Sequence, residues 1–211
     1  MPFIVFEGLD GSGKSSLLNA FEQNLKNKGI AYIRTREPGG TALGEEIRHL
    51  ILRHSDVPPT ARTELLLYQA SRSQHVDLLI RPHLEKGDWV LCDRFTASSL
   101  AFQGAARGIS YQEVATLNRF ATNGLQPDLT ILLDLQVSEA KKRRSGRQDQ
   151  SGEQQDRIES EADHFHEKVR QSFLQQATMD PGKWLVLNAE TKTEAMHELL
   201  LKKCQEIGWL S

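Results

Sequence analysis

The chain has 211 residues, of which 26% are charged and 38% hydrophobic, and its formal net charge is −2. This length suits one α/β domain over residues 1–211. The charge gives no overall basic field, so we expect neither nucleic acid nor a membrane as a partner. The two cysteines, Cys92 and Cys204, form no CxxC pair, which argues against a disulfide framework and favours a cytoplasmic location.

The first predicted strand, at residues 3–6, leads into a glycine-rich loop and then into a helix with apolar residues at helical spacing. The loop fits the P-loop pattern G-x-x-x-x-G-K-[ST] with residues Gly8, Leu9, Asp10, Gly11, Ser12, Gly13, Lys14 and Ser15. Its glycines let backbone N–H groups approach a polyphosphate such as that of ATP. Lys14 adds a positive charge near the β- and γ-phosphates, and the Ser15 hydroxyl suits Mg²⁺. An ordinary glycine-rich turn is the weaker alternative.

The next elements continue the alternation of strands and helices. A short strand is predicted at residues 30–33, and Thr41 can cap the helix that follows a Pro-Gly-Gly loop. Thr60 can cap a long helix that runs to about residue 87 and must bend or pause at Pro82.

A buried strand at residues 88–93 ends in Asp93, and Arg94 follows directly. A carboxylate at that position can hold Mg²⁺ directly or through water, although a loop-capping aspartate is the alternative. For Arg94 a surface ion pair is the alternative, but ligands of parallel sheets bind at the carboxyl ends of strands, which favours a phosphate contact.

Two more strands, at residues 129–133 and 184–187, complete the predicted pattern. Ser110 can cap a helix before the first of them, and the helix of residues 193–207 closes the chain. Five apolar strands that alternate with helices predict a parallel sheet covered on both faces. The loops after these strands should then converge at one edge of the sheet.

Three segments together resemble the signature segments of the thymidylate kinase family: residues 6–15, 36–41 and 93–104. The similarity in order and spacing extends from Phe3 to about Gln176. The resemblance implies a P-loop NTPase fold with five parallel strands, a homodimer, and Mg²⁺-assisted transfer of the ATP γ-phosphoryl group to dTMP. The residues by themselves indicate only a P-loop α/β phosphotransfer site.

The resemblance also implies an acceptor site for dTMP. The matching positions are Asp10, Glu37, Pro38, Arg48, Tyr68, Arg72, Arg94, Ser98, Ser99, Phe102 and Gln103. Arg48 and Arg94 match arginines that hold the acceptor phosphate. Tyr68 matches an aromatic ring that stacks on thymine, and Arg72 matches an arginine that bonds its O4. Phe102 matches an aromatic ring packed near the deoxyribose.

Some of these positions depart from the family or leave alternatives open. The family usually has Phe at position 68, whereas this chain has Tyr68, whose hydroxyl needs a hydrogen-bond partner if buried. The alternative role for Tyr68 is an aromatic ring of the core. The family usually has Tyr or His at position 95. Phe95 lacks the polar group that either of those side chains carries. Glu37 either orients the acceptor loop or caps the two glycines after Pro38. Asp10 matches a carboxylate near the sugar 3′-OH or nearby waters.

A basic run follows the fourth predicted strand: Lys141, Lys142, Arg143, Arg144, Ser145, Gly146 and Arg147. It would usually be a solvated face or a nucleic-acid patch, and its polar flanks are typical of a mobile loop. The P-loop has no arginine between its first and last glycine, however, and phosphoryl transfer needs cationic stabilisation. This resembles the branch of the family with a catalytic arginine in a lid, here about residues 141–157.

The catalytic candidates are therefore Lys14, Arg94, Arg143 and Arg147. Among the lid arginines, Arg144 and Arg157 are less favoured, and residues 148–155 look like an insertion that blurs the match.

Two other functions remain open at this point. One is a kinase for another nucleoside monophosphate, against which Arg72 and Phe102 favour dTMP. The other is a P-loop switch or nucleic-acid-binding ATPase, supported by the basic run but not by any second basic patch.

Overall fold

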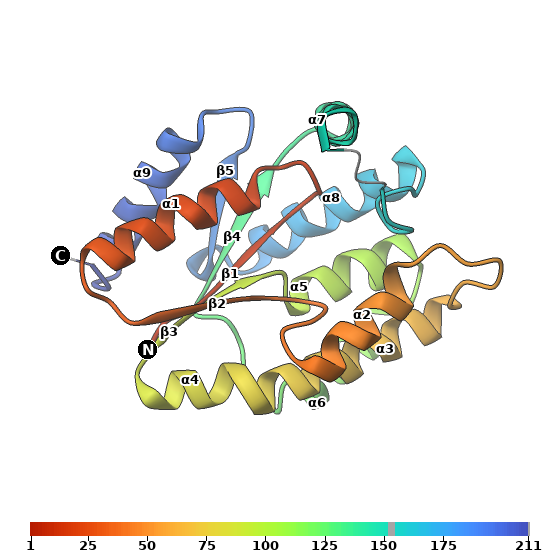
Figure 1. Cartoon of the computed structure of the whole chain (residues 1–211), viewed down its shortest axis with the longest axis horizontal. Helices are drawn as coiled ribbons and strands as arrows, with labels where there is room; N and C mark the ends of the chain where they lie inside the picture. The colour runs from red at the N-terminus through yellow and green to blue at the C-terminus, as the bar shows by residue number, and fades with distance from the viewer. Residues whose placement is uncertain (152–154, 211) are drawn as a thin grey trace.

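A five-stranded parallel sheet forms the centre of the computed structural model, which describes the backbone of residues 1–151 and 155–210 and the side chains of 1–146 and 155–210 (Figure 1). The strand order is β2-β3-β1-β4-β5. The strands are β1 (Phe3–Gly8), β2 (Tyr32–Arg36), β3 (Trp89–Asp93), β4 (Leu129–Asp134) and β5 (Trp184–Asn188). This confirms the predicted α/β fold with a parallel five-stranded sheet.

Helices cover both faces of the sheet, as predicted. On one face, α1 (Lys14–Asn27) packs against α9 (Thr193–Glu206) (Figure 1). The opposite face is covered by α4 (Arg81–Lys86), α8 (Asp163–Met179) and the π-helical segment η2 (Leu100–Ala106), with α5 (Thr96–Ser99) and α6 (Tyr111–Ala121) beside η2. Farther out, α2 (Ala42–Leu52) packs on α3 (Ala61–His75).

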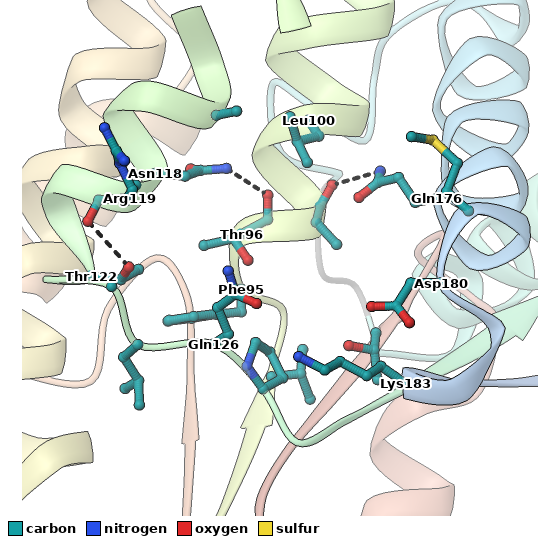
Figure 2. Close-up of a pocket in the computed structure, with 18 of the residues that line it drawn as sticks. Phe95, Thr96, Leu100, Asn118, Arg119, Thr122, Gln126, Gln176, Asp180 and Lys183 are labelled. Atoms are coloured by element: carbon teal, nitrogen blue, oxygen red, sulfur yellow. Dashed lines mark hydrogen bonds between the residues drawn. The ribbon is translucent and has the colours of Figure 1, made fainter. Parts of the chain in front are cut away.

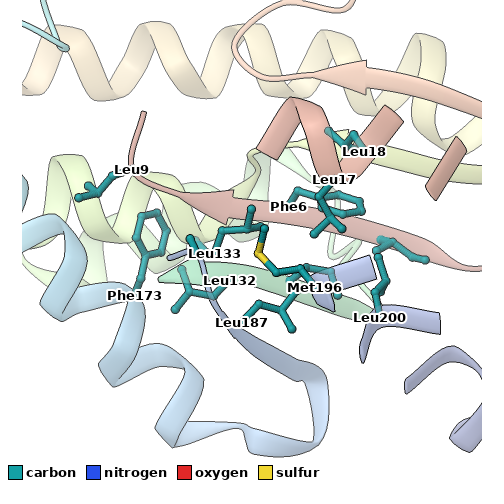
Figure 3. Close-up of a cluster of buried hydrophobic side chains, with 14 of the residues drawn as sticks. Phe6, Leu9, Leu17, Leu18, Leu132, Leu133, Phe173, Leu187, Met196 and Leu200 are labelled. Carbon is teal, nitrogen blue, oxygen red and sulfur yellow. The ribbon is translucent and has the colours of Figure 1, made fainter. Parts of the chain in front are cut away.

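The main hydrophobic core lies between β1, β4, β5 and the helices that cover them. Figure 3 shows the part of it built from Phe6, Leu9, Leu17, Leu18, Leu132, Leu133, Phe173, Leu187, Met196 and Leu200. Leu17 and Leu18 of α1 are fully buried, because α1 turns its apolar stripe toward the sheet. The core therefore fixes α1, and with it the loop between β1 and α1.

The predicted helix caps are confirmed. The Thr41 side chain accepts a hydrogen bond from the Gly44 amide, and Thr60 and Ser110 accept from Thr63 and Glu113.

The long helix does pause before Pro82, as predicted. The π-helical segment η1 (Val76–Ile80) lies between α3 and α4, and the Arg81 amide bonds the Val76 carbonyl five residues back. Proline has no N–H to donate, so a local change of helix register before it is expected.

Two predicted elements differ in the structure. The second strand is Tyr32–Arg36, displaced from residues 30–33, because β2 is an edge strand whose register pairs Tyr32 with Trp89 and Arg36 with Asp93. The basic run, whose polar flanks are typical of a mobile loop, is helical. It lies in helix α7 (Val137–Ser151), where Lys142 and Arg143 pair with Glu139 one turn away. Lysine, arginine and glutamine are good helix formers, and such pairs stabilise a helix that has few apolar residues.

The parallel register brings three loops to one edge of the sheet. Asp93 at the end of β3 lies opposite both Phe6 of β1 and Arg36 of β2. The P-loop, the loop that begins at Glu37 and the loop that begins at Arg94 therefore start side by side. In the described part of the chain, no helix has the length and apolar character needed to cross a membrane.

Candidate active site

The P-loop packs closely against the backbone of β4 and of helix α7 (Val137–Ser151). Gly8 has a φ of +138°, and a Cβ atom there would lie 2.5 Å from the Leu133 carbonyl oxygen. Gly11 has a φ of +89°, and its Cβ would lie 2.8 Å from the Ala140 carbonyl oxygen of α7. Only glycine fits both positions. The second contact also shows that α7 packs directly against the P-loop.

Lys14 lies in the first turn of α1 and folds back over the loop. Its Nζ donates to the carbonyl oxygens of Gly8 and Leu9, both at 3.1 Å, and lies 3.6 Å from Asp10 Oδ1. These contacts hold the ammonium group at the mouth of the loop, at the positive end of the α1 dipole. The arrangement is an anion site made of one cation and converging backbone N–H groups.

Buried atoms without a protein partner lie beside this loop. Within the described residues, Ser12 Oγ and Asp93 Oδ1 are buried and have no hydrogen-bond partner. Such atoms usually belong to a site that a ligand or an ion completes. Asp93 is a carboxylate at the end of β3, next to β1, and Ser15 is exposed in the first turn of α1. These oxygen donors fit Mg²⁺, which prefers few protein ligands and shares its shell with phosphates and water.

Arg94 joins the P-loop to the acceptor side. It has a φ of +68°, which is unusual for a non-glycine residue, and its Nη2 donates to Asp10 Oδ1 at 2.7 Å. Its Nη1 lies 3.9 Å from Glu7 Oε2, and the guanidinium lies 5.1 Å from the centre of the Phe102 ring. The predicted alternative of a surface ion pair does not hold, because this side chain is only 14% exposed.

Charges around Arg94 set the protonation of its neighbours. Burial alone would raise the pKa of Asp10, but Arg94 and Lys14 more than offset this and hold that pKa well below its usual range. For Glu7, burial dominates and raises the pKa despite Arg94. Asp10 is thus a carboxylate at neutral pH, as required to orient Arg94.

A cavity of about 100 Å³ opens beside Arg94. All but one of the predicted acceptor residues line it: Asp10, Glu37, Pro38, Arg48, Tyr68, Arg72, Arg94, Ser98, Phe102 and Gln103. The exception is Ser99, whose Oγ accepts a hydrogen bond from Arg72 behind the cavity wall. The sequence prediction missed Leu52, Phe95, Asp156, Ile158 and Glu159, which complete the lining.

Arg72 is the most deeply buried cation of this cavity, with a side chain only 1% exposed. Its Nε donates to Glu37 Oε2 at 2.7 Å, its Nη1 to Asn118 Oδ1 at 2.8 Å, and its Nη2 to the Phe95 carbonyl at 3.0 Å. This rigid fork orients the guanidinium at the wall of the cavity.

Glu37 therefore orients Arg72, and the capping alternative is wrong. The amide of Gly39 donates to Ser71 and that of Gly40 donates to Glu45. The second Glu37 oxygen bonds His75 Nδ1 at 3.1 Å, and His75 Nε2 lies 2.6 Å from Thr35 Oγ1.

The two positions that depart from the family differ in their surroundings. Tyr68 is half-buried and faces the cavity, and burial together with nearby Glu64 raises the pKa of its hydroxyl. Phe95 is fully buried and packs edge-on against Phe3, with ring centres 4.9 Å apart. An apolar ring at position 95 is thus explained by core packing, and Tyr68 lies where a ring can contact a base.

The lid arginines point in different directions. Arg143 Nη1 donates to the Ala189 carbonyl after β5, whereas Arg144 is buried and donates from Nη1 to the Asp10 carbonyl of the P-loop at 3.1 Å. Within the described residues, Arg144 Nε is buried without a partner. The Arg147 side chain lies outside the described residues. Arg157 turns instead toward α2 and α3, as discussed below.

Two further residues that the sequence did not single out support the site. Glu7 in β1 accepts hydrogen bonds from the amides of Phe95 and Ser98 and from Ser98 Oγ. The sequence signal that could have identified Glu7 is a charged residue within an otherwise apolar strand. Asn118 of α6 accepts from Arg72 and donates to the Thr96 carbonyl. No local pattern points to Asn118, because its partners are distant in sequence.

A larger recess of about 770 Å³ lies on the sheet face between α6 and α8 (Figure 2). Its walls include Thr96, Arg119, Gln126 and Lys183. None of the P-loop residues lines this recess. It is therefore not the site of phosphoryl transfer, although its volume is the larger of the two. It meets the acceptor cavity only at Phe95, which lines both.

Comparisons with known proteins agree with this geometry. A family model described as thymidylate kinase matches residues 6–200. The chain is 60% identical over 206 residues to a protein named thymidylate kinase from Bdellovibrio bacteriovorus, covering 98% of this chain and 96% of that protein. It is 45% identical to one of the same name from Synechococcus sp., covering 97% of each. The crystal structure of thymidylate kinase from Ehrlichia chaffeensis superposes with a TM-score of 0.75 at 28% identity, covering 96% of this chain and 97% of the other.

Proposed function

The chain belongs to the thymidylate kinase family, and we propose that it transfers the γ-phosphoryl group of ATP to dTMP, giving dTDP and ADP for dTTP synthesis. One observation carries this function most directly: the predicted acceptor residues line one cavity that Arg94 connects to the P-loop. Donor and acceptor sites thus meet at a single buried arginine. The donor is ATP, and Mg²⁺ is the metal that the family requires.

The chemistry needs positioning and charge neutralisation more than covalent catalysis. A phosphate acceptor is already an anion, so no general base is required. Lys14 and the P-loop amides hold the donor phosphates, and Arg94 and Arg48 face the acceptor phosphate from the cavity wall. Held by Ser15 and Asp93, Mg²⁺ would neutralise charge on the donor phosphates.

The base would be selected by a ring and by fixed donors. Tyr68 offers a face for stacking, and Arg72 and Gln103 present polar atoms that cannot easily turn away. Phe102 is buried at the sugar side, where a 2′-OH would be crowded.

A panel of acceptors tests the substrate. ADP release from ATP and Mg²⁺ is coupled to NADH oxidation, with dTMP, dCMP, UMP or dGMP added at equal concentration. We expect dTMP to give the highest kcat/KM by at least about 100-fold, because a buried polar site rejects a base that leaves its groups unpaired. If dTMP raises turnover no more than dCMP or UMP, the assignment of the acceptor is wrong.

The catalytic lid arginine is expected among Arg143, Arg147 and Arg144. The contact between Arg144 and the P-loop supports adding it to the two favoured from the sequence. Replacing each in turn with methionine should lower kcat by about 10³-fold or more in at least one variant, because an arginine that stabilises the transferring phosphoryl group contributes that much. Stopped-flow turnover with saturating dTMP and ATP measures this effect. Near-normal kcat in all three variants would place the role outside α7.

We further propose that residues 1–211 form one kinase domain that pairs as a homodimer through α3 and α6. Large apolar side chains stand exposed there: Leu66 is 56%, Tyr111 57% and Phe120 85% exposed. Leu66 and Phe120 stand on two helices that pack on each other, and exposed apolar side chains of this size support a protein interface there. Phe120→Asp should convert the dimer to a monomer in sedimentation velocity, whereas Met179→Asp, at another exposed apolar site on α8 (67% exposed), should not. A monomeric unmodified protein would contradict the dimer.

A cytoplasmic location completes the proposal. It is supported by Cys92 and Cys204, which are both free and buried. Free thiols are typical of a reducing compartment.

A further inference from the structure

A buried carboxylate, Glu64, lies in the first turn of α3, away from the P-loop. Gln103 Nε2 donates to its Oε1 at 2.9 Å, and Arg157 Nη2 donates to its Oε2 at 2.6 Å. Arg107 contacts both oxygens, at 3.3 Å from Nε and 3.2 Å from Nη2. Donors from two segments far apart in sequence, residues 103–107 and Arg157, therefore share this carboxylate.

The charge on Glu64 is kept by these donors. Burial alone would raise its pKa, but the hydrogen bonds from Gln103, Arg107 and Arg157 more than offset burial and lower that pKa. A carboxylate buried without such partners would be strongly disfavoured. Each donor is thus held in place because the buried carboxylate of Glu64 needs its hydrogen bond.

Arg157 reaches a second element as well. Its Nε donates to the Ile51 carbonyl at 3.0 Å, and its backbone amide donates to the Leu52 carbonyl at 3.0 Å. These two carbonyls are at the end of α2, where the helix leaves them without intrahelical partners. Arg157 therefore bridges the end of α2 and the start of α3, and its side chain is only 12% exposed.

The residues next to Arg157 form part of the acceptor cavity. Asp156, Ile158 and Glu159 line it together with Tyr68, and Gln103, which bonds Glu64, lines it too. The turn that carries them is closed by Asp156 Oδ1, which accepts from the amides of Ile158 and Glu159, both at 2.8 Å. Among the contacts of the described residues, Arg157 ties this cavity wall to both α2 and α3. Arg107, which contacts Glu64, also pairs with Glu161 at 2.6 Å just beyond the wall.

We propose that Arg157 is a positioning residue of the acceptor site: through Glu64 and the end of α2, it holds the segment of residues 156–159 as a wall of the dTMP cavity. This inference rests on the proposed function for the identity of the ligand. On this proposal, Arg157 is no longer a candidate for the catalytic lid arginine. Its loss weakens acceptor binding and leaves the chemical step at saturating substrate nearly unchanged.

The test compares Arg157→Met with the unmodified enzyme. We expect the Kd for dTMP, measured by calorimetry, and the KM for dTMP to rise about 10-fold to 100-fold, since a charge-assisted hydrogen bond of this kind is worth that factor. The kcat at saturating dTMP and the KM for ATP should stay within about threefold. Arg157→Lys keeps a cation beside Glu64 and should recover most of the dTMP affinity.

Lys141→Met provides a matched control in the same region. Lys141 pairs with Asp163 at 3.0 Å and so joins α7 to α8, but both side chains are more than half exposed. Removing an exposed pair should leave the KM for dTMP unchanged. A similar rise in the KM for dTMP in Lys141→Met and Arg157→Met would overturn the specific role of Arg157.

Two further results would overturn the proposal. One is an Arg157→Met enzyme with unchanged dTMP affinity. The other is a loss of kcat with unchanged KM, which would place Arg157 at the reacting phosphate. If Arg157→Met does not fold, the variant E64Q/R157M removes both buried charges and should fold with the same loss of dTMP affinity; normal affinity in it would also overturn the proposal.

Hydrogen exchange separates this inference from the proposed function. Without nucleotide, the amides of residues 156–160 should exchange faster in Arg157→Met than in the unmodified protein, whatever the substrate is. Unchanged exchange would count against the positioning role. Failure of the unmodified enzyme to phosphorylate dTMP would instead count against the proposed function.

Discussion

Replacing Arg94 with methionine is expected to lower kcat/KM for dTMP by about 10²–10³-fold, as for other preorganised donors that face a developing charge. Arg94 is the cation that links the P-loop to the acceptor cavity, through its 2.7 Å bond to Asp10. Its backbone lies in the left-handed region, so the turn after β3 is shaped to aim this side chain. Methionine keeps much of the length and the contact with Phe102 but removes the charge.

Two control variants test whether the effect of Arg94→Met comes from the loss of this particular guanidinium. Arg94→Lys should recover only part of the activity, because an ammonium group cannot serve Asp10 and a phosphate in the same fixed geometry. Arg62→Met, at an exposed position of α3, should be nearly normal. Steady-state kinetics measures all three. An Arg94→Met enzyme within about fivefold of the unmodified one would contradict its place at the acceptor phosphate.

Arg72→Ala is expected to raise the KM for dTMP and also to destabilise the fold by about 3–5 kcal/mol. Its guanidinium is fully enclosed, and without it the buried carboxylate of Glu37 keeps only His75 as a side-chain partner among the described residues. The base-recognition role and the structural role are thus carried by one side chain. Urea unfolding measures the stability, and the coupled assay with dTMP and dCMP measures the choice of base.

Arg36→Met is the matched control for Arg72. Arg36 also pairs with a glutamate, Glu45, at 2.7 Å, but the side chains are 51% and 44% exposed. The free energy of unfolding should change by less than about 1 kcal/mol, because solvent screens such a pair. Equal destabilisation by both variants, or an unchanged preference for dTMP in Arg72→Ala, would contradict the account of Arg72.

The sequence predicted the parts of the site that depend on local patterns. The glycines and Lys14 of the P-loop follow from a motif whose geometry is nearly the same wherever a strand, a tight loop and a helix follow one another. Asp93 and Arg94 could be placed at the active edge because strands of a parallel sheet end there. The acceptor residues came from resemblance to the family, and the cavity that they line agrees with it.

The parts that could not be predicted depend on distant partners or on weak local signals. Glu64 and Arg157 are 93 positions apart, and nothing near either residue indicates that they meet in the interior. The polar flanks of the basic run are typical of a mobile loop, yet the run lies in α7, where Arg143 pairs with Glu139 and Ala140 lies against Gly11. The sequence also did not favour Arg144, because its contact with the P-loop depends on the helical fold of α7.

The fate of the γ-phosphoryl group tests the central claim most directly. The purified enzyme is incubated with dTMP, Mg²⁺ and ATP labelled in its γ-phosphoryl group, and the products are separated by anion-exchange chromatography. A dTMP kinase must place the label in the β-phosphate of dTDP, in equal amount to the ADP formed. Label released as inorganic phosphate, at a rate that dTMP does not change, would contradict the account and indicate an ATPase.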